Sequence, residues 1–213
     1  MVQKQLSYKY QVYNELKKGI LTGQYPPGSV MNERKLSEEM AIREGLQMLA
    51  RDGWLQMETY KGAVVREFDP HYMWELSRIR YALELSAAED AVKNMTDQGL
   101  ERLRQIQAAQ REDLSNYNVD EFIRHDREFH SCIYEMSLNR ELMKLASNYY
   151  DVFRFLGMQA VMGTEERRLT TIEEHQDILE AMEQHNPKAA VQAMKKHMEQ
   201  TETNIRRHIK IAP

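Results

Sequence analysis

The sequence of 213 residues contains one cysteine, Cys132, so no disulfide can close within the chain. A lone cysteine agrees with a reducing compartment, and we interpret it as a small buried side chain rather than a reactive thiol. No apolar run approaches the roughly 18–20 residues of a membrane helix, and residues 1–11 lack the apolar centre of a signal peptide. We therefore expect a soluble, cytoplasmic protein that does not bind a membrane.

The sequence also lacks a strong net charge, because 29 Lys and Arg face 33 Asp and Glu, for a net charge of −4. Nothing global therefore attracts nucleic acid. The balance is uneven, since ten basic and nine acidic residues lie in residues 1–69 and the acidic excess lies downstream. This distribution permits DNA binding by the N-terminal part without indicating it. A hydrophobic content of 42% suffices for a core in each of two modest domains.

Helix-start signals recur after residue 69. Asp69 is a good N-cap and Pro70 suits the first helical position, which predicts a long helix toward Val92. Further starts are predicted at Thr96, Asn118, Asn139, Thr164 and Asn186. About six helices with short connections predict an all-α antiparallel bundle over residues 70–213.

Residues 1–69 instead mix helices with a pair of strands. The expected elements are helices over residues 6–21, 33–40 and 41–51 and strands over 54–58 and 63–65. The Gly- and Pro-rich stretch 23–28 ends the first helix, and residues 59–62 turn between the strands. This order predicts a winged helix-turn-helix, and the chain as a whole is expected to be mostly α.

Four side chains that titrate or bind metal lie where the helical periodicity calls for apolar residues. They are Asp126, His130, His175 and His197. The three-then-four spacing around them marks one face of each of three predicted helices. Burying a neutral polar group without a partner costs roughly 2–7 kcal/mol, and a charge costs far more. Some partner in a shared interior must therefore satisfy these groups.

A divalent metal satisfies all four groups at once. Imidazole suits zinc, nickel, manganese or iron, and the carboxylate of Asp126 adds negative charge beside three neutral histidines. Asp126 and His130 lie one helical turn apart and can chelate one ion. Any one buried histidine is more simply explained as a satisfied core residue, whereas the four taken together favour a metal.

Other functions fit the same four residues. Three His and an Asp leave coordination positions open, as in a metal-dependent hydrolase or dismutase. No second carboxylate is placed as a general base, because Glu128 and Glu174 lie off the inward face. A metal sensor, in which the ion itself is the signal, is a further alternative.

Several stretches of the sequence occur together in one family of proteins. In the N-terminal part they are residues 21–28 followed by 32–36, residues 42–46 through 51–55, and residues 61–65. In the C-terminal part they are residues 80–84, residues 126–130, the pair Glu174-His175, and His197. With these features the chain resembles the GntR family of bacterial transcription regulators, in its FadR-type branch with a C-terminal FCD ligand-binding domain. The resemblance covers nearly the whole chain.

The resemblance implies a winged helix-turn-helix DNA-binding domain over residues 1–69 and an FCD-type effector- and metal-binding domain over residues 70–213. Such regulators bind a pseudo-palindromic operator in double-stranded DNA as homodimers, with the helix-turn-helix in the major groove. Arg34 and Arg43 would contact phosphates and base edges. Lys61 and Gly62 would bring the wing tip to the neighbouring groove.

One part of the family pattern is absent. Before Ile42 the family carries a glycine turn and the start of the recognition helix, and several of these residues are missing between Met40 and Ile42. Either the printed sequence omits a segment, or the protein lacks the part that reads bases. The intact flanking stretches favour omission.

In the second domain the resemblance implies a divalent metal, zinc first, that is held by the same Asp and three His and helps to bind a small carboxylate effector. One arginine and a metal would neutralise one or two carboxylates, which suggests a small organic acid such as a sugar acid or hydroxy acid. Arg80 lies on the inward face of its predicted helix, where its guanidinium either clamps the effector carboxylate or pairs with Glu84. Asn204 also faces the cavity on a helical wheel. We expect effector binding to release DNA, as in a repressor.

Overall fold

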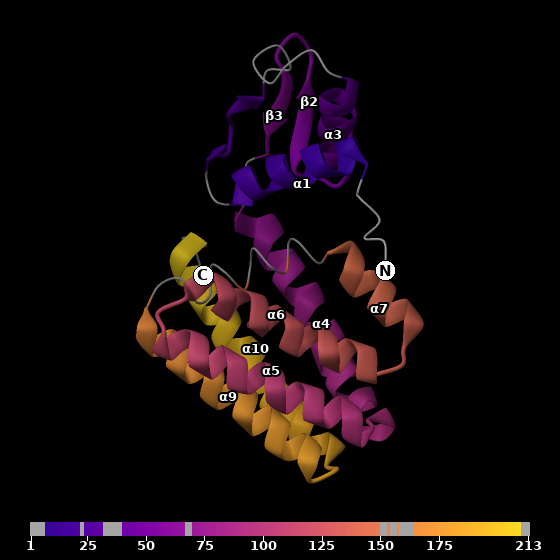
Figure 1. Ribbon diagram of the computed structural model, residues 1–213, viewed down its shortest axis with the longest axis vertical. Coiled ribbons are helices and arrows are strands. Elements are labelled where there is room, and N and C mark those ends of the chain that lie inside the picture. Colours follow the sequence, from indigo (N-terminus) through magenta and orange to yellow (C-terminus); the bar gives the residue numbers. More distant parts are fainter. Residues whose placement is uncertain are drawn as a thin grey trace. The chain divides into compact units, whose positions relative to one another are not determined.

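The computed structural model describes residues 7–21, 24–31, 40–66, 70–149, 153, 157 and 164–209. The chain divides into two compact units, residues 1–69 and residues 70–213 (Figure 1). Each unit has its own core. Among the described helices, none is long and apolar enough to cross a membrane.

The first unit contains two described helices and a three-stranded sheet. Their bounds are α1 Tyr8–Leu21, β1 Val30–Met31, α3 Met40–Arg51, β2 Leu55–Glu58 and β3 Gly62–Val65. The sheet is antiparallel in the order β1-β3-β2, with Met57 opposite Ala63 in the wing hairpin. The sequence did not predict β1, because a two-residue strand is too short to show alternation.

Helix α3 packs against α1 through a close backbone approach. A side chain at Gly45 would come within 3.0 Å of Val12 Cγ1, so a glycine at this position lets the two helices meet. The described core of this unit is completed by residues such as Leu46, Leu49 and Trp54. Met40 is the first residue of α3, so the predicted boundary between residues 40 and 41 is wrong by one residue. The predicted helix over 33–40 otherwise lies outside the described residues. Where the family carries a turn, the chain runs as continuous helix from Met40 through Ile42.

The second unit is helical in all of its described elements. They are α4 Pro70–Asn94, α5 Asp97–Ser115, α6 Val119–Met136, α7 Arg140–Asn148, α9 Glu165–Glu183 and α10 Pro187–Ile209. The predicted N-caps Thr96, Asn118, Asn139 and Thr164 each accept a hydrogen bond from the backbone N–H three residues later. Pro70 and Pro187 occupy first helical positions. Asn186 likewise accepts from the backbone N–H of Ala189, whereas the predicted N-cap Asp69 lies outside the described residues. The other predicted starts and the mostly helical fold are confirmed.

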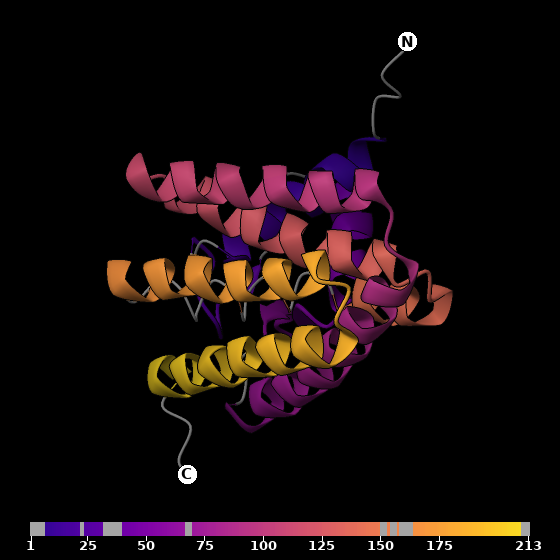
Figure 2. The same cartoon turned by 90° about the horizontal axis from the view of Figure 1, so that it is seen from below.

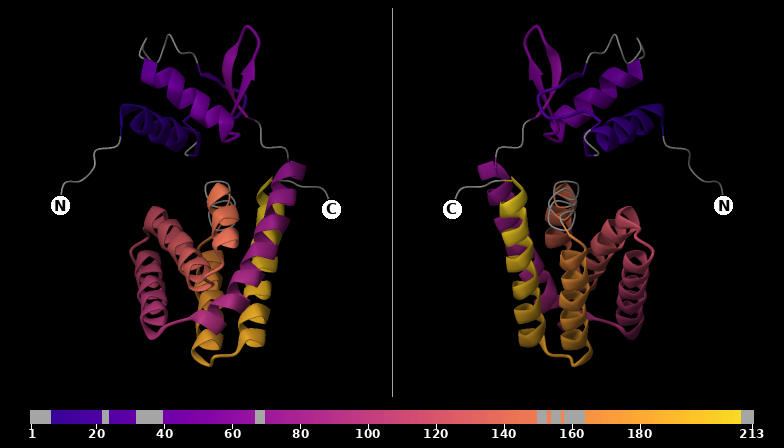
Figure 3. Two further views of the ribbon diagram at one scale, coloured as in Figure 1. Left: turned by 90° about the vertical axis from the view of Figure 1, so that its right-hand side faces the viewer. Right: turned by 90° about the vertical axis from the view of Figure 1, so that its left-hand side faces the viewer.

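The long helices of the second unit form a bundle. Helix α5 packs on α6 and α9, and α10 packs on α4 and α9 (Figure 2). Figure 3 shows α4 and α10 running side by side, and α4 also packs on α6. Large side chains such as Phe122, Phe129 and Met194 are fully buried between the helices. The bundle therefore encloses one interior to which α4, α5, α6, α9 and α10 all contribute side chains.

Candidate metal and effector site

The helix faces predicted to point inward are buried. On α6, α9 and α10 the twelve residues of the three predicted stripes are all at most 5% exposed: Phe122, Asp126, Phe129, Ile133, Ile172, His175, Leu179, Met182, Ala190, Met194, His197 and Thr201. His130, which follows Phe129 on α6, is 4% exposed, so all three histidines and the carboxylate lie in the core as expected. Burial alone does not make them ligands, so their geometry decides what they can do.

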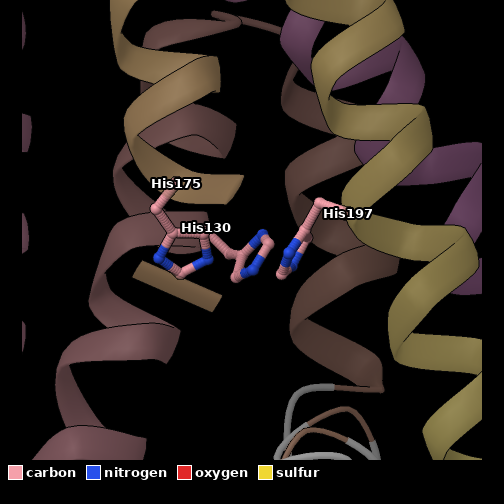
Figure 4. A group of neighbouring side chains, drawn as sticks. All are labelled: His130, His175 and His197. Atoms are coloured by element: carbon pink, nitrogen blue, oxygen red, sulfur yellow. The ribbon is translucent and has the colours of Figure 1, made fainter. Parts of the chain in front are cut away.

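The three imidazoles converge from three different helices (Figure 4). His130 comes from α6, His175 from α9 and His197 from α10, and one nitrogen of each lies within 4.8 Å of the others. The ring centroids lie 4.8–5.4 Å apart. Phe129 stacks on His175 with ring centroids 4.1 Å apart, which fixes the plane of that imidazole. A single ion placed between the rings could reach all three.

Each imidazole is oriented by a second buried residue that hydrogen-bonds to its Nδ1. The pairs are His130 with Glu84 at 2.9 Å, His175 with Gln110 at 2.8 Å, and His197 with Glu174 at 2.8 Å. An acceptor at Nδ1 keeps the proton there and leaves the lone pair of Nε2 free to bind a metal. Metal-binding histidines in proteins almost always have such a partner.

Two of the inner nitrogens lack a hydrogen-bond partner in the described part of the chain. Nε2 of His130 and Nε2 of His175 are buried and make no hydrogen bond to any described residue. Burial, followed by the neighbouring imidazoles, lowers the pKa of His175 and of His197 well below 6.5, so both rings are neutral. Neutral imidazoles with orphaned, converging nitrogens fit a divalent metal such as zinc.

Asp126 lies at the edge of this group. Its Oδ1 is 3.6 Å from His175 Nε2, and it accepts a hydrogen bond of 3.5 Å from Gln110 Nε2. It is buried, but its oxygens are not among the ligand atoms that all lie within 4.8 Å of one another. The expectation that Asp126 is a fourth ligand therefore stays a prediction.

Sequence reasoning missed the residues that orient the imidazoles. We predicted that Glu174 lies off the inward face, and this is wrong, since only 2% of it is exposed. Both of its oxygens accept hydrogen bonds of 2.9 Å from Arg167, which lies two turns earlier on α9. That spacing of seven residues between opposite charges was a usable signal. Nothing in the sequence marks Gln110.

A cavity of about 200 Å³ adjoins His130 and is lined by residues of α4, α6 and α7 and by Phe153. Arg80 lines it, as expected for an effector clamp, but its Nε also donates to Glu84 Oε1 at 3.3 Å. Although burial acts against ionisation, His130 and Arg80 lower the pKa of Glu84 to about 2, so this carboxylate is charged. The pairing of Arg80 with Glu84 is therefore observed, and its role as an effector clamp stays a prediction.

Asn204 was also predicted to face the cavity. Its side-chain amide donates to the Gln200 carbonyl on the same helix at 2.8 Å. It is not among the residues that line the cavity beside His130. The geometry gives Asn204 a local role in α10, and we do not include it in the effector site proposed below.

The predicted DNA contacts lie in the first unit. Arg34 is outside the described residues. Arg43 is exposed on α3, and Lys61 and Gly62 lie at the turn between β2 and β3, where Gly62 has a φ of 89°. Glu58 lies 2.7 Å from Lys61 Nζ and raises the pKa of Lys61, so the lysine is charged but already paired.

Two exposed residues of this unit were not predicted. Gln47 lies one turn after Arg43 on the exposed side of α3. Tyr60 is fully exposed at the wing tip with a φ of 70°. The sequence did contain signals for both: a glutamine four residues after an arginine in a predicted helix, and an aromatic residue in the predicted loop between two strands.

Comparison with known proteins identifies the family. Residues 9–65 match the family described as bacterial regulatory proteins, gntR family, and residues 75–200 match the FCD domain. The chain is a GntR-type transcription regulator with an FCD domain. Its DNA-binding function follows from this membership.

Individual relatives agree with the assignment. The chain is 29% identical over 196 residues to the HTH-type transcriptional regulator YdhC of Bacillus subtilis, covering 89% of this chain and 87% of YdhC. It is 23% identical over 204 residues to the HTH-type transcriptional repressor RspR of Escherichia coli, covering 92% of this chain and 88% of RspR. The solved structure of Escherichia coli McbR has the same fold, with a TM-score of 0.78 at 22% identity, covering 95% of this chain and 99% of McbR.

These relatives are transcription regulators rather than enzymes. The buried histidines of the FCD domain therefore belong to a regulator, and the alternative of a metal-dependent hydrolase or dismutase is set aside.

Proposed function

We propose that the FCD domain of this regulator holds one divalent metal, zinc first, on Nε2 of His130, His175 and His197 with Asp126 as a fourth ligand. The observation that carries this proposal is the convergence of three imidazoles whose Nδ1 atoms each already have a buried partner. Four protein ligands leave one or two positions for water or an effector oxygen. Nickel, manganese and iron would fit the same donors.

The charges around the metal indicate how many negative charges an effector brings. Glu84 balances Arg80 at the cavity wall, so this arginine offers no uncompensated charge. A divalent metal with Asp126 and three neutral imidazoles carries one net positive charge. A monocarboxylate neutralises it, and Arg80 at the cavity wall orients the carboxylate. We propose a small monocarboxylic acid as the effector.

For the DNA we propose that residues 1–69 bind an operator half-site and that a homodimer reads a pseudo-palindrome. Arg43 and Gln47 on the exposed side of α3 are suited to base edges, since Arg pairs with guanine and Gln with adenine. Lys61 and Gly62 would approach the backbone from the wing, and Arg34 is retained from the sequence as a further contact.

Effector and DNA would be linked through residues 70–213. A coupling free energy of about 1–3 kcal/mol changes operator affinity 5–150-fold. We propose that the acid weakens DNA binding, which would make the protein a repressor, as the name of RspR states for that relative.

The test begins with duplexes selected from a random-sequence library by the full chain. We then measure binding of the selected duplex by the metal-free and the zinc-loaded protein while a series of short monocarboxylic acids is added. The expected result is a pseudo-palindromic duplex whose affinity falls 5–150-fold with acid only when zinc is bound.

The variant His197→Asn should lose this zinc dependence, whereas His71→Asn, at an exposed histidine of α4, should keep it. An acid effect of equal size without zinc would contradict metal-assisted capture. Release of DNA by zinc alone would instead identify a metal sensor, and acid-strengthened binding would overturn the repressor assignment.

A further inference from the structure

The cavity beside His130 contains a buried hydroxyl group to which no described residue is hydrogen-bonded. Tyr134 lies one turn after His130 on α6, lines the cavity, and is only 8% exposed. Its hydroxyl oxygen makes no hydrogen bond to any described residue. Buried polar groups in proteins are nearly always hydrogen-bonded, so an exception next to a cavity points to a ligand.

The neighbouring Glu84 carboxylate interacts with this hydroxyl, but not through a well-formed hydrogen bond. One of its oxygens accepts from Arg80 and the other from His130. Burial and then the Glu84 carboxylate raise the pKa of Tyr134, so the phenol keeps its proton and is available as a donor. The cavity therefore presents a hydrogen-bond donor one helical turn from the metal-binding imidazole.

The cavity also limits the size of a ligand. Its volume of about 200 Å³ corresponds to about six or seven water molecules at roughly 30 Å³ each. This volume suits a small organic acid rather than a large ligand. Around Tyr134 the wall includes Met143, Ala146 and Phe153, which favour a short carbon chain over a densely hydroxylated one.

We propose that Tyr134 is a specificity-determining residue that donates a hydrogen bond to a second oxygen of the effector acid, so that acids with a hydroxyl or oxo group bind in preference to acids without one. This inference rests on the proposed effector function of the same cavity. The carboxylate lies toward Arg80 and the metal, and the second oxygen lies toward the phenol. An acid lacking that oxygen leaves the buried hydroxyl without a partner and binds less well.

The first test needs no effector. We compare thermal unfolding of the zinc-loaded full chain with that of Tyr134→Phe, which removes only the hydroxyl. The expected midpoint is unchanged or higher, because the hydroxyl has no internal partner. A midpoint lowered by about 3 °C or more would show that the hydroxyl is satisfied inside the protein, through Glu84 or otherwise, and would overturn the proposal.

The second test measures affinities of the zinc-loaded protein by calorimetry for matched pairs of acids, namely lactate with propionate, pyruvate with propionate, and 3-hydroxybutyrate with butyrate. At least one oxygenated acid should bind about tenfold more tightly than its partner. Tyr134→Phe should remove that preference by weakening the oxygenated acid alone. Tyr81→Phe, at a half-buried tyrosine of α4 that does not line the cavity, should keep it.

The outcomes separate this inference from the proposed function. If acids bind but the preference is absent, or persists in Tyr134→Phe, the role of Tyr134 is wrong and the monocarboxylate effector stands. If no acid of any pair binds the zinc-loaded protein, the proposed effector function fails and the inference falls with it.

Discussion

Three buried residues orient the histidines so that each can offer a nitrogen lone pair to the metal. We do not propose that these three residues bind the metal themselves. Glu84, Gln110 and Glu174 come from three helices, and each accepts a hydrogen bond from the Nδ1 of one imidazole. Two of them are carboxylates with their own arginine, and the third is a neutral amide. At the residue scale the site is therefore a set of three oriented imidazoles supported by a surrounding layer of charge pairs.

Gln110 offers the sharpest test of this supporting layer. Gln110→Leu removes the acceptor for His175 and the donor to Asp126, so zinc affinity should fall about 10–100-fold. The matched control is Gln107→Leu, because Gln107 is also buried on α5 and also bonds to α9, through the Ile172 carbonyl at 3.4 Å. Competition with a chelating dye measures both affinities. Equal zinc affinities in the two variants would show that Gln110 has only a structural role.

Gly157 provides a second residue-scale prediction. It is helical and buried, and an added Cβ would lie 3.5 Å from Asp126 Oδ2 and 3.6 Å from Arg80 Nη1, which are ordinary contacts. Gly157→Ala should therefore fold and gain up to about 1 kcal/mol from helix propensity. The methyl group would lie near both a proposed metal ligand, Asp126, and the proposed effector clamp, Arg80, so monocarboxylate affinity should fall several-fold. Calorimetry measures this affinity. Unchanged acid binding by Gly157→Ala would show that the region next to Gly157 is not part of the effector site.

Residue-scale prediction from the sequence succeeded where periodicity carried the information. His175 and Thr201 lie at buried positions of regular helices, and their burial follows from spacing alone. Glu174 was misplaced because a bundle helix between several neighbours buries more than one stripe. Asn204 faced the interior on a helical wheel, yet its amide bonds to its own helix. Contacts between helices that are distant in the sequence, such as the contact of Gln110 with His175, can be found only from the three-dimensional structure.

At the scale of elements, local chemistry predicted the second unit well. A capping side chain fixes a helix start within a few residues of sequence, which is why Thr96, Asn118, Asn139 and Thr164 were all correct. Strand β1 depends instead on pairing with β3 across more than 30 residues of sequence, and no local signal marks it. The boundary at Met40 was misplaced because helix ends carry the weakest signal.

Helix α3 gives the prediction at this scale. Gln47→Ala should weaken binding of the selected duplex about 5–150-fold, the equivalent of 1–3 kcal/mol for one lost bidentate base contact, while leaving binding to random DNA nearly unchanged. Lys18→Ala, at an exposed residue of α1, is the control and should change neither affinity by more than about twofold. Titration by fluorescence anisotropy measures both. An equal loss on selected and random DNA would assign Gln47 to the phosphate backbone instead.

At the scale of the whole molecule, the buried titratable groups couple stability to pH in the metal-free protein. Burial lowers the pKa of His175 and of His197 below 6.5, so the unfolded chain binds two protons that the folded chain does not. Burial raises the pKa of Glu174 from 4.5 to about 7, so the folded chain binds one proton that the unfolded chain lacks. The two histidine protons of the unfolded chain minus the one Glu174 proton of the folded chain leave the unfolded chain with one extra proton between pH 6.5 and 4.5.

The stability of the metal-free protein should therefore fall as pH falls through this window, by at most about 1.4 kcal/mol per pH unit. In the variant His175→Gln the unfolded and folded chains differ by no net proton, because one histidine proton is offset by the Glu174 proton. Its stability should therefore change little with pH in this window. Urea unfolding in the presence of a chelator, at several pH values, measures both slopes. Stability of the metal-free protein that rises on acidification, or a slope in His175→Gln equal to that of the unmodified protein, would contradict this assignment.

The metal would also tie the bundle together, because its ligands and their supporting residues come from α4, α5, α6, α9 and α10. Zinc at 100 times its dissociation constant should stabilise the fold by about 2.7 kcal/mol. Thermal unfolding with and without zinc measures this, and the gain should vanish in His130→Asn. A gain of equal size in that variant would place the bound zinc elsewhere on the chain.

The most direct test of the central claim is the X-ray absorption spectrum of the zinc-loaded chain, recorded at one zinc per protein. The account predicts a first shell with three imidazole nitrogens at about 2.0–2.1 Å and one or more oxygens, without sulfur. It also predicts that His197→Asn loses this spectrum. Zinc bound by fewer than three imidazoles, or an identical spectrum from His197→Asn, would contradict the account.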